Sequence, residues 1–164
     1  MHNDPDVRPV GLCTRDASEQ VSTAFRRPSL RWRLAASRPD VAQVAYELEV
    51  AANAKFDDCL ASTGRVESAV PFGAIWPRTD IASREVVWCR VRVWTDLGLT
   101  DWSEPLRLEG TLYQPADWIA RPISPLANAG QIDPVPAPLL RRAFTITKPV
   151  SSARLYVTAL GIHD

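Results

Sequence analysis

Acidic and histidine side chains are the first candidates for chemistry in this sequence, because hydrolytic enzymes use them as acids, bases and nucleophiles. The two histidines, His2 and His163, stand at opposite ends of a chain of 164 residues. A Ser-His-Asp or Cys-His arrangement would need one of them, so neither arrangement is favoured. Paired carboxylates, which glycoside hydrolysis uses, are the remaining catalytic option. The pairs are Asp57 with Asp58 and Asp96 with Asp101.

Neither carboxylate pair has the pattern that catalysis requires. Neighbouring residues point in opposite directions on an extended strand, so the side chains of Asp57 and Asp58 would diverge. Asp96 and Asp101 flank a turn signal at 96–98, where acidic side chains commonly bond to the backbone. We interpret both pairs as solvated loop chemistry, and we predict no catalytic residue in this chain.

The three cysteines, Cys13, Cys59 and Cys89, are far apart in the sequence. No two of them have the close spacing of zinc ligands, and the sequence has neither an acidic calcium loop nor a glycine-rich phosphate loop. We therefore expect no metal and no cofactor. An odd number of thiols leaves one unpaired in a monomer, which favours a reducing compartment. Because the N-terminus has no secretory signal, the expected location is the cytoplasm.

Tryptophan and arginine form the most unusual pattern in the chain. In the stretch 86–94, VVWCRVRVW, an extended backbone would place Trp88, Arg90, Arg92 and Trp94 on one face. A turn signal follows, and a returning segment would lay Trp102 over the same row. Guanidinium groups stack flat on aromatic rings. We call these five residues the Trp/Arg ladder and interpret them as a rib that stiffens the sheet. The alternative is a stacking platform for sugars or bases.

Two further tryptophans, Trp76 and Trp118, lie outside the ladder. An exposed indole can stack on a ligand, whereas a half-buried indole often anchors a neighbouring domain. For both residues we keep two interpretations open, a ligand contact and an inter-domain contact.

The ladder needs a rigid strand beneath it, and the other face of 86–94 predicts one. Small apolar side chains alternate there with the ladder residues, which is the period of a half-buried strand. The segments 28–34 and 42–51 alternate in the same way, although the second also contains good helix formers. In 42–51 the alternation places Val44 and Val50 inward and Gln43 outward. The expected core residues are Trp32, Tyr46, Leu48, Val91 and Val93.

About seven short extended pieces fall between residues 7 and 109, and no long helical pattern interrupts them. This rhythm is typical of an all-β protein, an immunoglobulin-like or fibronectin type III-like antiparallel β-sandwich. One helical turn is expected at 53–60, where Phe56 and Leu60 are four residues apart. Formal net charge is +0, so bulk electrostatics favours neither nucleic acid nor an anionic membrane as a partner.

The expected organisation has four parts. Residues 1–6 form a disordered lead, 7–110 the β-sandwich, and 111–138 an extended proline-rich connector. Residues 139–164 contain two further strand patterns, 140–147 and 153–160, which we interpret as the first strands of a truncated second β-sandwich. Two strands alone are not stable in water, and their open edges invite self-association with another copy of the chain.

Several pieces of the sequence, taken in order, resemble one known family. They are PSLRWRL (28–34), QVAYELEVA (43–51), WCRVRVW (88–94), DWIA (117–120), LRRAF (140–144) and ARLYVTALG (153–161). Together they resemble the N-terminal region of bacterial α-L-rhamnosidases, the inverting glycoside hydrolases that remove terminal rhamnose. The resemblance implies a fibronectin-like first domain followed by the opening strands of a sandwich often described as carbohydrate-binding.

The same resemblance implies that the catalytic carboxylates lie on a later α/α barrel, so it assigns no catalytic residue here. It favours a non-catalytic accessory module that packs against downstream domains of the same polypeptide, an α-L-rhamnosidase. Two alternatives stay open. One is a stand-alone carbohydrate-binding module that takes a rhamnoside on Trp76, Trp94 or Trp118. The other is a protein-interaction domain of fibronectin type, suggested by Trp102-Ser103-Glu104.

Overall fold

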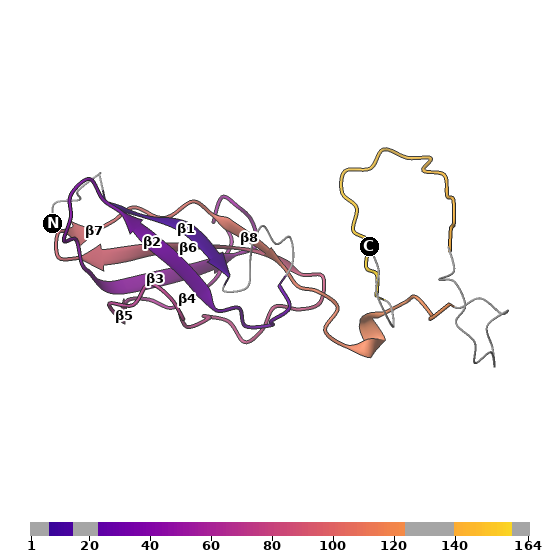
Figure 1. Cartoon of the computed structure of the whole chain (residues 1–164), viewed down its shortest axis with the longest axis horizontal. Helices are drawn as coiled ribbons and strands as arrows, with labels where there is room; N and C mark the ends of the chain where they lie inside the picture. The colour runs from indigo at the N-terminus through magenta and orange to yellow at the C-terminus, as the bar shows by residue number, and fades with distance from the viewer. Residues whose placement is uncertain (1–6, 15–22, 124–139, 159–164) are drawn as a thin grey trace, which may run out of the picture. The chain divides into compact units, whose positions relative to one another are not determined.

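The computed structural model describes residues 7–14, 23–123 and 140–158 (Figure 1). They belong to two compact units, Met1–Arg121 and Pro122–Asp164, and each unit is described by itself. The regular secondary structure of the first unit is β-strand apart from one short 3-10 helix. Its elements are β1 (Arg8–Thr14), β2 (Leu30–Ala35), β3 (Gln43–Ala51), β4 (Cys59–Ser62), β5 (Val66–Glu67), β6 (Val86–Thr95), β7 (Gly98–Leu99), β8 (Leu106–Glu109) and the short 3-10 helix η1 (Pro115–Asp117).

The strands of the first unit form two antiparallel sheets. The smaller sheet is β1 paired with β2, and the larger has six strands in the order β4-β3-β6-β7, with β5 added on β3 and β8 on β6. Figure 1 shows β1 and β2 crossing the face of the larger sheet. Buried side chains from both sheets form one hydrophobic cluster. The predicted all-β sandwich is therefore confirmed. No helix among the described residues is both long and apolar enough to cross a membrane.

The inward-facing side chains of β6 are the most completely buried part of the core. Val87, Cys89, Val91 and Val93 are each 0% exposed, and they alternate with half-buried residues of the opposite face. Burial raises the pKa of the Cys89 thiol far above its usual range, so the thiol stays neutral and packs as an apolar group. Full burial of each valine stabilises the fold by about 1.5–3 kcal/mol.

Strands β2 and β3 supply the aromatic part of the core. Trp32 and Tyr46 pack edge to face, with ring centroids 5.3 Å apart. The indole N–H of Trp32 donates to Oε1 of Gln43 at 2.9 Å. The amide group of Gln43 in turn donates to the backbone oxygens of Ser68 and Val70. The buried polar atoms of Trp32 and Gln43 are thus paired, which removes the cost of burying them.

The first residues of β3 differ from the prediction. Alternation predicts Val44 inward and Gln43 outward, but Gln43 is buried and Val44 is 42% exposed. The register between β3 and β6 shifts between Gln43 and Ala45, which places a β-bulge there. One extra residue reverses the facing of the side chains that precede it. Beyond the bulge, Leu48 and Val50 are fully buried, as alternation predicts.

Residues 53–60 do not form the predicted helical turn. Oδ1 of Asn53 accepts the N–H of Lys55, and the backbone oxygen of Asn53 accepts the N–H of Phe56. Phe56 has a φ of 58°, in the left-handed region, so a right-handed helix cannot continue through it. The asparagine side chain thus favours a turn over a helix, and β4 begins at Cys59.

The second unit forms neither of the strands predicted at 140–147 and 153–160, as far as residues 140–158 are described. Its large apolar side chains lie in solvent; Phe144 is 81% and Leu155 87% exposed. A strand requires a hydrogen-bonded neighbour, and none pairs with these residues among those described. The expected lead at 1–6, residues 124–138 of the expected connector and residues 159–164 lie outside the described residues.

The bulge can be tested with one substitution made on either side of it. We expect Val50→Ala to lower the free energy of unfolding by about 1.5–3 kcal/mol, because Val50 is fully buried. Val44→Ala removes the same atoms from an exposed side chain and should change stability by no more than about 0.5 kcal/mol. Urea unfolding followed by tryptophan fluorescence measures both. Equal losses would show that Val44 faces the core.

Candidate functional site

The outward row of β6 carries the Trp/Arg ladder. Arg90 and Arg92 both stack on the ring of Trp102, with their Cζ atoms 4.4 and 4.5 Å from its centroid. Arg92 also lies over Trp94, at 5.5 Å. Trp88 is half-buried on the same face of the strand. Two guanidinium groups therefore hold one indole between them, and each such contact contributes on the order of 0.5–1 kcal/mol at an exposed site.

A glutamate directly opposite on β3 neutralises each of the two ladder arginines. The register pairs Arg90 with Glu49 and Arg92 with Glu47. In both pairs the shortest nitrogen–oxygen distance is 2.7 Å. The edge of each guanidinium group binds a carboxylate while its flat face stacks on an indole. The sequence analysis missed the two glutamates, although their period of two on a neighbouring strand is a usable signal.

Trp102 reaches the ladder because hydroxyl groups hold its segment against β6. The N–H of Val91 donates to Oγ of Ser103 at 3.1 Å, and the N–H of Ser103 donates back to the oxygen of Val91 at 2.8 Å. Thr100 makes the same pair of bonds with Val93. The hydroxyl groups of the serine and the threonine thus take the place of backbone acceptors in a regular sheet. They hold Trp102, which lies between these two residues in the sequence, over the arginines.

The stack is longer than the sequence predicts. Phe56 lies against Arg90, with 4.1 Å between Cζ and the ring centroid, and Arg65 lies over Trp94 at 5.0 Å. Arg65 also binds Glu67, at 2.7 Å. These additions come from segments far away in the sequence and carry no local periodicity. Only the pairing of the strands brings them to the two ends of the ladder.

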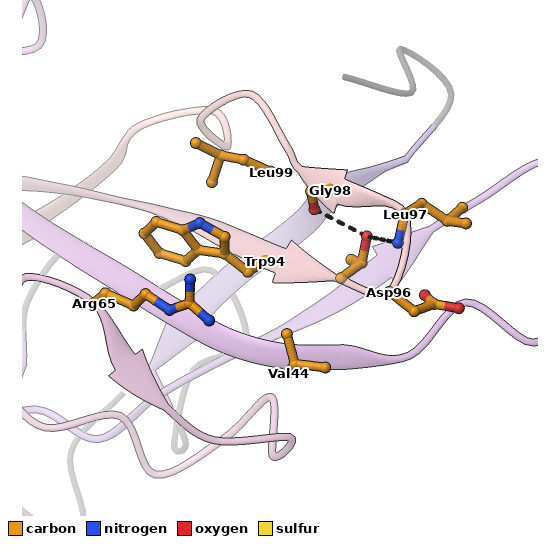
Figure 2. A pocket seen from close by; sticks show the side chains of 8 residues that line it. Val44, Arg65, Trp94, Asp96, Leu97, Gly98 and Leu99 are labelled. Carbon is orange, nitrogen blue, oxygen red and sulfur yellow. Dashed lines mark hydrogen bonds between the residues drawn. The ribbon is translucent and has the colours of Figure 1, made fainter. Parts of the chain in front are cut away.

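An open groove with a volume of about 360 Å³ lies at the Arg65 end of the ladder. Figure 2 shows Arg65 beside the indole of Trp94, with Leu99 and Val44 completing the apolar lining. The carboxylate of Asp96, also in the lining, accepts a backbone N–H at 3.1 Å. Arg65 and Arg92 both lie over the indole. They occupy the stacking positions that a sugar ring would need.

The two tryptophans outside the ladder have different surroundings. Trp76 is only 8% exposed and belongs to the hydrophobic core. Trp76 therefore packs in the core, which leaves little of its ring exposed for the ligand or inter-domain contact that the sequence suggests. Trp118 is half-buried directly after η1, and its backbone N–H donates to the backbone oxygen of Pro115 at 3.2 Å.

A group of contacts that we call the exit latch holds the chain where it leaves the sandwich. The N–H of Arg84 donates to the oxygen of Gly110 at 2.9 Å, and its guanidinium group donates to the backbone oxygen of Asp117 at 2.6 Å. Oγ of Ser83 donates to the Asp117 carboxylate and accepts the N–H of Tyr113. These bonds attach the segment that follows β8 to the loop that precedes β6.

Close packing explains two residues of the exit latch. A Cβ atom on Gly110 would lie 2.1 Å from the backbone oxygen of Ala82, so this approach requires glycine. The hydroxyl of Tyr113 donates to the oxygen of Thr23 at 3.0 Å, and the Arg26 guanidinium lies 4.8 Å from its ring centroid. The first compact unit consequently runs to residue 121, past the sandwich boundary that the sequence suggests.

The candidate carboxylate pairs lie in exposed loops. Asp57 accepts a hydrogen bond from the side-chain amide of Asn53, and Asp96 caps a backbone N–H at the start of β3. Within the ranges 7–14, 23–123 and 140–158, no three His, Cys, Asp or Glu side chains lie close enough together to hold a metal ion. His2 and His163 are outside the described residues. The free cysteines are Cys13, Cys59 and Cys89.

Comparison with known proteins gives consistent matches. Residues 9–114 match the family described as "Rha78A-like, N-terminal immunoglobulin domain". An α-L-rhamnosidase of Alteromonas sp. (strain LOR) is 36% identical over 88 residues, which are 50% of this chain and 10% of that protein. An α-L-rhamnosidase of Formosa agariphila is 27% identical over 148 residues, which are 84% of this chain and 16% of that protein.

Solved structures agree with the sequence matches. The structure of the Streptomyces avermitilis α-L-rhamnosidase complexed with L-rhamnose superposes with a TM-score of 0.64 at 25% identity. That match covers 70% of this chain and 11% of the Streptomyces protein. The Aspergillus terreus α-L-rhamnosidase gives a TM-score of 0.60, also at 25% identity. This chain therefore spans only a small part of the length of the proteins that it matches.

Two antiparallel sheets packed on one hydrophobic core give the sandwich architecture of an immunoglobulin-like domain. The family match covers well over half of the chain. The chain belongs to the family of Rha78A-like N-terminal immunoglobulin domains.

The ladder can be tested through its central ring. We expect Trp102→Ala to lower the free energy of unfolding by about 1–3 kcal/mol, because it removes the ring on which both arginines stack. Trp102→Phe keeps an aromatic face and should lose less than half as much. Urea unfolding at constant ionic strength measures the two variants. An unchanged stability for Trp102→Ala would show that the stack contributes nothing.

The exit latch predicts a dependence on pH. The pKa of Asp117 lies below its ordinary value of 3.8, chiefly because the Ser83 hydroxyl donates to it and also because the Gln114 N–H does. A lowered folded-state pKa means stabilisation that is complete above the unfolded-state pKa and lost as the pH falls through the folded-state pKa.

Wild type should therefore be more stable than Asp117→Asn at pH 7, and this advantage should shrink as the pH falls below about 3.8. Thermal unfolding across that range measures the difference. Ser83→Ala, which removes the main cause of the lowered pKa, should flatten the same curve. A difference between wild type and Asp117→Asn that stays constant with pH would contradict the assignment.

Proposed function

We propose that this chain is a non-catalytic support module of an α-L-rhamnosidase whose other domains hydrolyse terminal α-L-rhamnosides. The observation that carries this proposal is how the charged side chains of β3 and β6 are used. The arginines of β6 bind the glutamates of β3 and also stack on an indole. These contacts stiffen the surface and engage the guanidinium and carboxylate groups of β3 and β6 within the domain.

The exit latch supports the same role. A domain that only had to be attached to an enzyme would leave on a flexible linker. Here the segment that follows β8 is bonded to the sandwich through Ser83, Arg84 and Asp117. A segment bonded to the sandwich in this way suits a module that packs against the domains that follow it.

Carbohydrate binding is the second function suggested by the sequence, and the geometry favours it less. Trp76 is buried in the core, and the faces of Trp94 already carry Arg65 and Arg92. Trp118 is half-buried beside η1, and its one indole would be a small stacking surface for a sugar. We therefore assign Trp118 to inter-domain contact and attribute the rhamnoside specificity to other parts of the parent enzyme.

Removal of the module from the full-length polypeptide tests the proposed function. We expect deletion of residues 1–121 to lower the thermal midpoint of the parent while kcat per folded molecule changes by less than about twofold. The latch variant Ser83→Ala in the full polypeptide should lower the midpoint in the same direction by a smaller amount.

The isolated chain of 164 residues supplies the opposite arm of this experiment. It should release no more rhamnose from an aryl α-L-rhamnoside than buffer does. Turnover by the isolated chain, or loss of kcat without loss of stability in the deletion variant, would contradict a supporting role.

A further inference from the structure

The outer face of the smaller sheet is unlike the ladder face. The register pairs Val10 with Arg33 and Cys13 with Arg31, and residues opposite each other share a face. A bridge continues the row from Arg31 to Phe72. We call this surface the open face. Its outward residues are Arg8, Val10, Cys13, Arg31, Arg33 and Phe72.

The arginines of the open face have no carboxylate partner among the described residues. Arg8, Arg31 and Arg33 are all exposed, and the nearest polar contact of Arg31 is the weak acceptor Sγ of Cys13, at 3.3 Å. Seven arginines elsewhere in the sandwich bind glutamate or aspartate. Those paired arginines are Arg26, Arg27, Arg65, Arg78, Arg90, Arg92 and Arg107.

An apolar ring accompanies the unpaired charges. Phe72 is 66% exposed, although its backbone is held against β2 by the bonds from Trp32 N–H to the oxygen of Pro71 and from Gly73 N–H to the oxygen of Leu30. The ring is thus presented on a fixed backbone. Arginine and aromatic residues on rigid elements are the composition that protein–protein interfaces favour, and they supply most hot spots.

We propose that the open face docks onto a carboxylate-bearing protein surface in the remainder of the same polypeptide. This inference rests on the proposed function and adds the surface that performs it. Charge complementarity defines the chemistry of the partner, because a face that carries three guanidinium groups is matched by carboxylates opposite them. The chain spans 10% and 16% of two relatives, so in proteins of that kind most of the surface available to this face belongs to other domains.

The native thiols provide a probe of the docking. Cys13 lies on the open face, Cys59 is exposed in β4 at the other sheet, and Cys89 is fully buried in the core. Iodoacetamide labelling followed by peptide mass spectrometry measures each thiol separately. We expect Cys13 to react at least about tenfold more slowly in the full-length polypeptide than in the 164-residue chain, with Cys59 reacting equally in both.

Two charge substitutions separate docking from folding. Arg33→Glu reverses a charge on the open face and should restore fast labelling of Cys13 in the full-length polypeptide. Lys55→Glu makes the same change of charge in the β3–β4 turn and should leave Cys13 protected. Cys89 reports folding, because it stays unlabelled only while the core is intact. If Arg33→Glu exposes Cys89, Arg33→Gln replaces it.

Each remaining outcome overturns the open-face proposal. Equal labelling of Cys13 in the two chains would do so, and so would protection of Cys59 instead of Cys13. Slower labelling of Cys13 at higher concentration of the 164-residue chain would assign the face to a second copy. The proposed function fails separately, through the deletion of residues 1–121. If that deletion destabilises the parent while Cys13 labels equally, the supporting role stands and only the docking surface is wrong.

Discussion

Burial of one side of β6 is the constraint on which the rest of the sandwich depends. Four consecutive inward residues of this strand are completely dry, and they pack against the aromatic pair of Trp32 and Tyr46. Strict alternation then sends every second residue of the same strand outward. The core beneath β6 therefore fixes the register of the strand, and this register decides which side chains lie on the outer face.

This chain places arginine and tryptophan at those outward positions. Each guanidinium group has a flat face and a hydrogen-bonding edge, and both are used: Trp102 covers the faces of Arg90 and Arg92, and Glu47 and Glu49 bind their edges. Single surface ion pairs are worth little, because side-chain entropy and solvent screening oppose them. Here each ordered side chain makes several contacts. The loss of side-chain conformational entropy is therefore smaller per contact than in a single ion pair.

The two outer faces of the domain consequently have different physical character. The face of the larger sheet is closed by its own stacking and ion pairing. The face of the smaller sheet leaves Arg31 and Arg33 in solvent beside an exposed Phe72. The proposed supporting role would use both properties, a stiff body that holds its shape and a surface that gains contacts from its neighbour. The exit latch bonds the segment up to Asp117 to the sandwich.

Most of the strands were predictable because their signals are local. Alternation in 86–94 and 28–34 needs only the period of an extended chain, and it predicted the burial of Trp32 and Val91. The outward facing of the ladder arginines was predictable for the same reason, whereas Trp102 was placed by the turn signal at 96–98. The strands expected in 140–158 have the same alternation but no partner among the described residues, so the pattern alone did not produce a strand.

The sequence by itself determined the fold class and the central strand, since composition and period suffice for these. The tertiary structure alone decided the bulge that turns Gln43 inward, the burial of Trp76 and the addition of Phe56 and Arg65 to the stack. Each of these depends on which distant segments become neighbours. A hydrogen bond from Trp32 to Gln43, for example, favours a bulge that no local pattern within β3 announces.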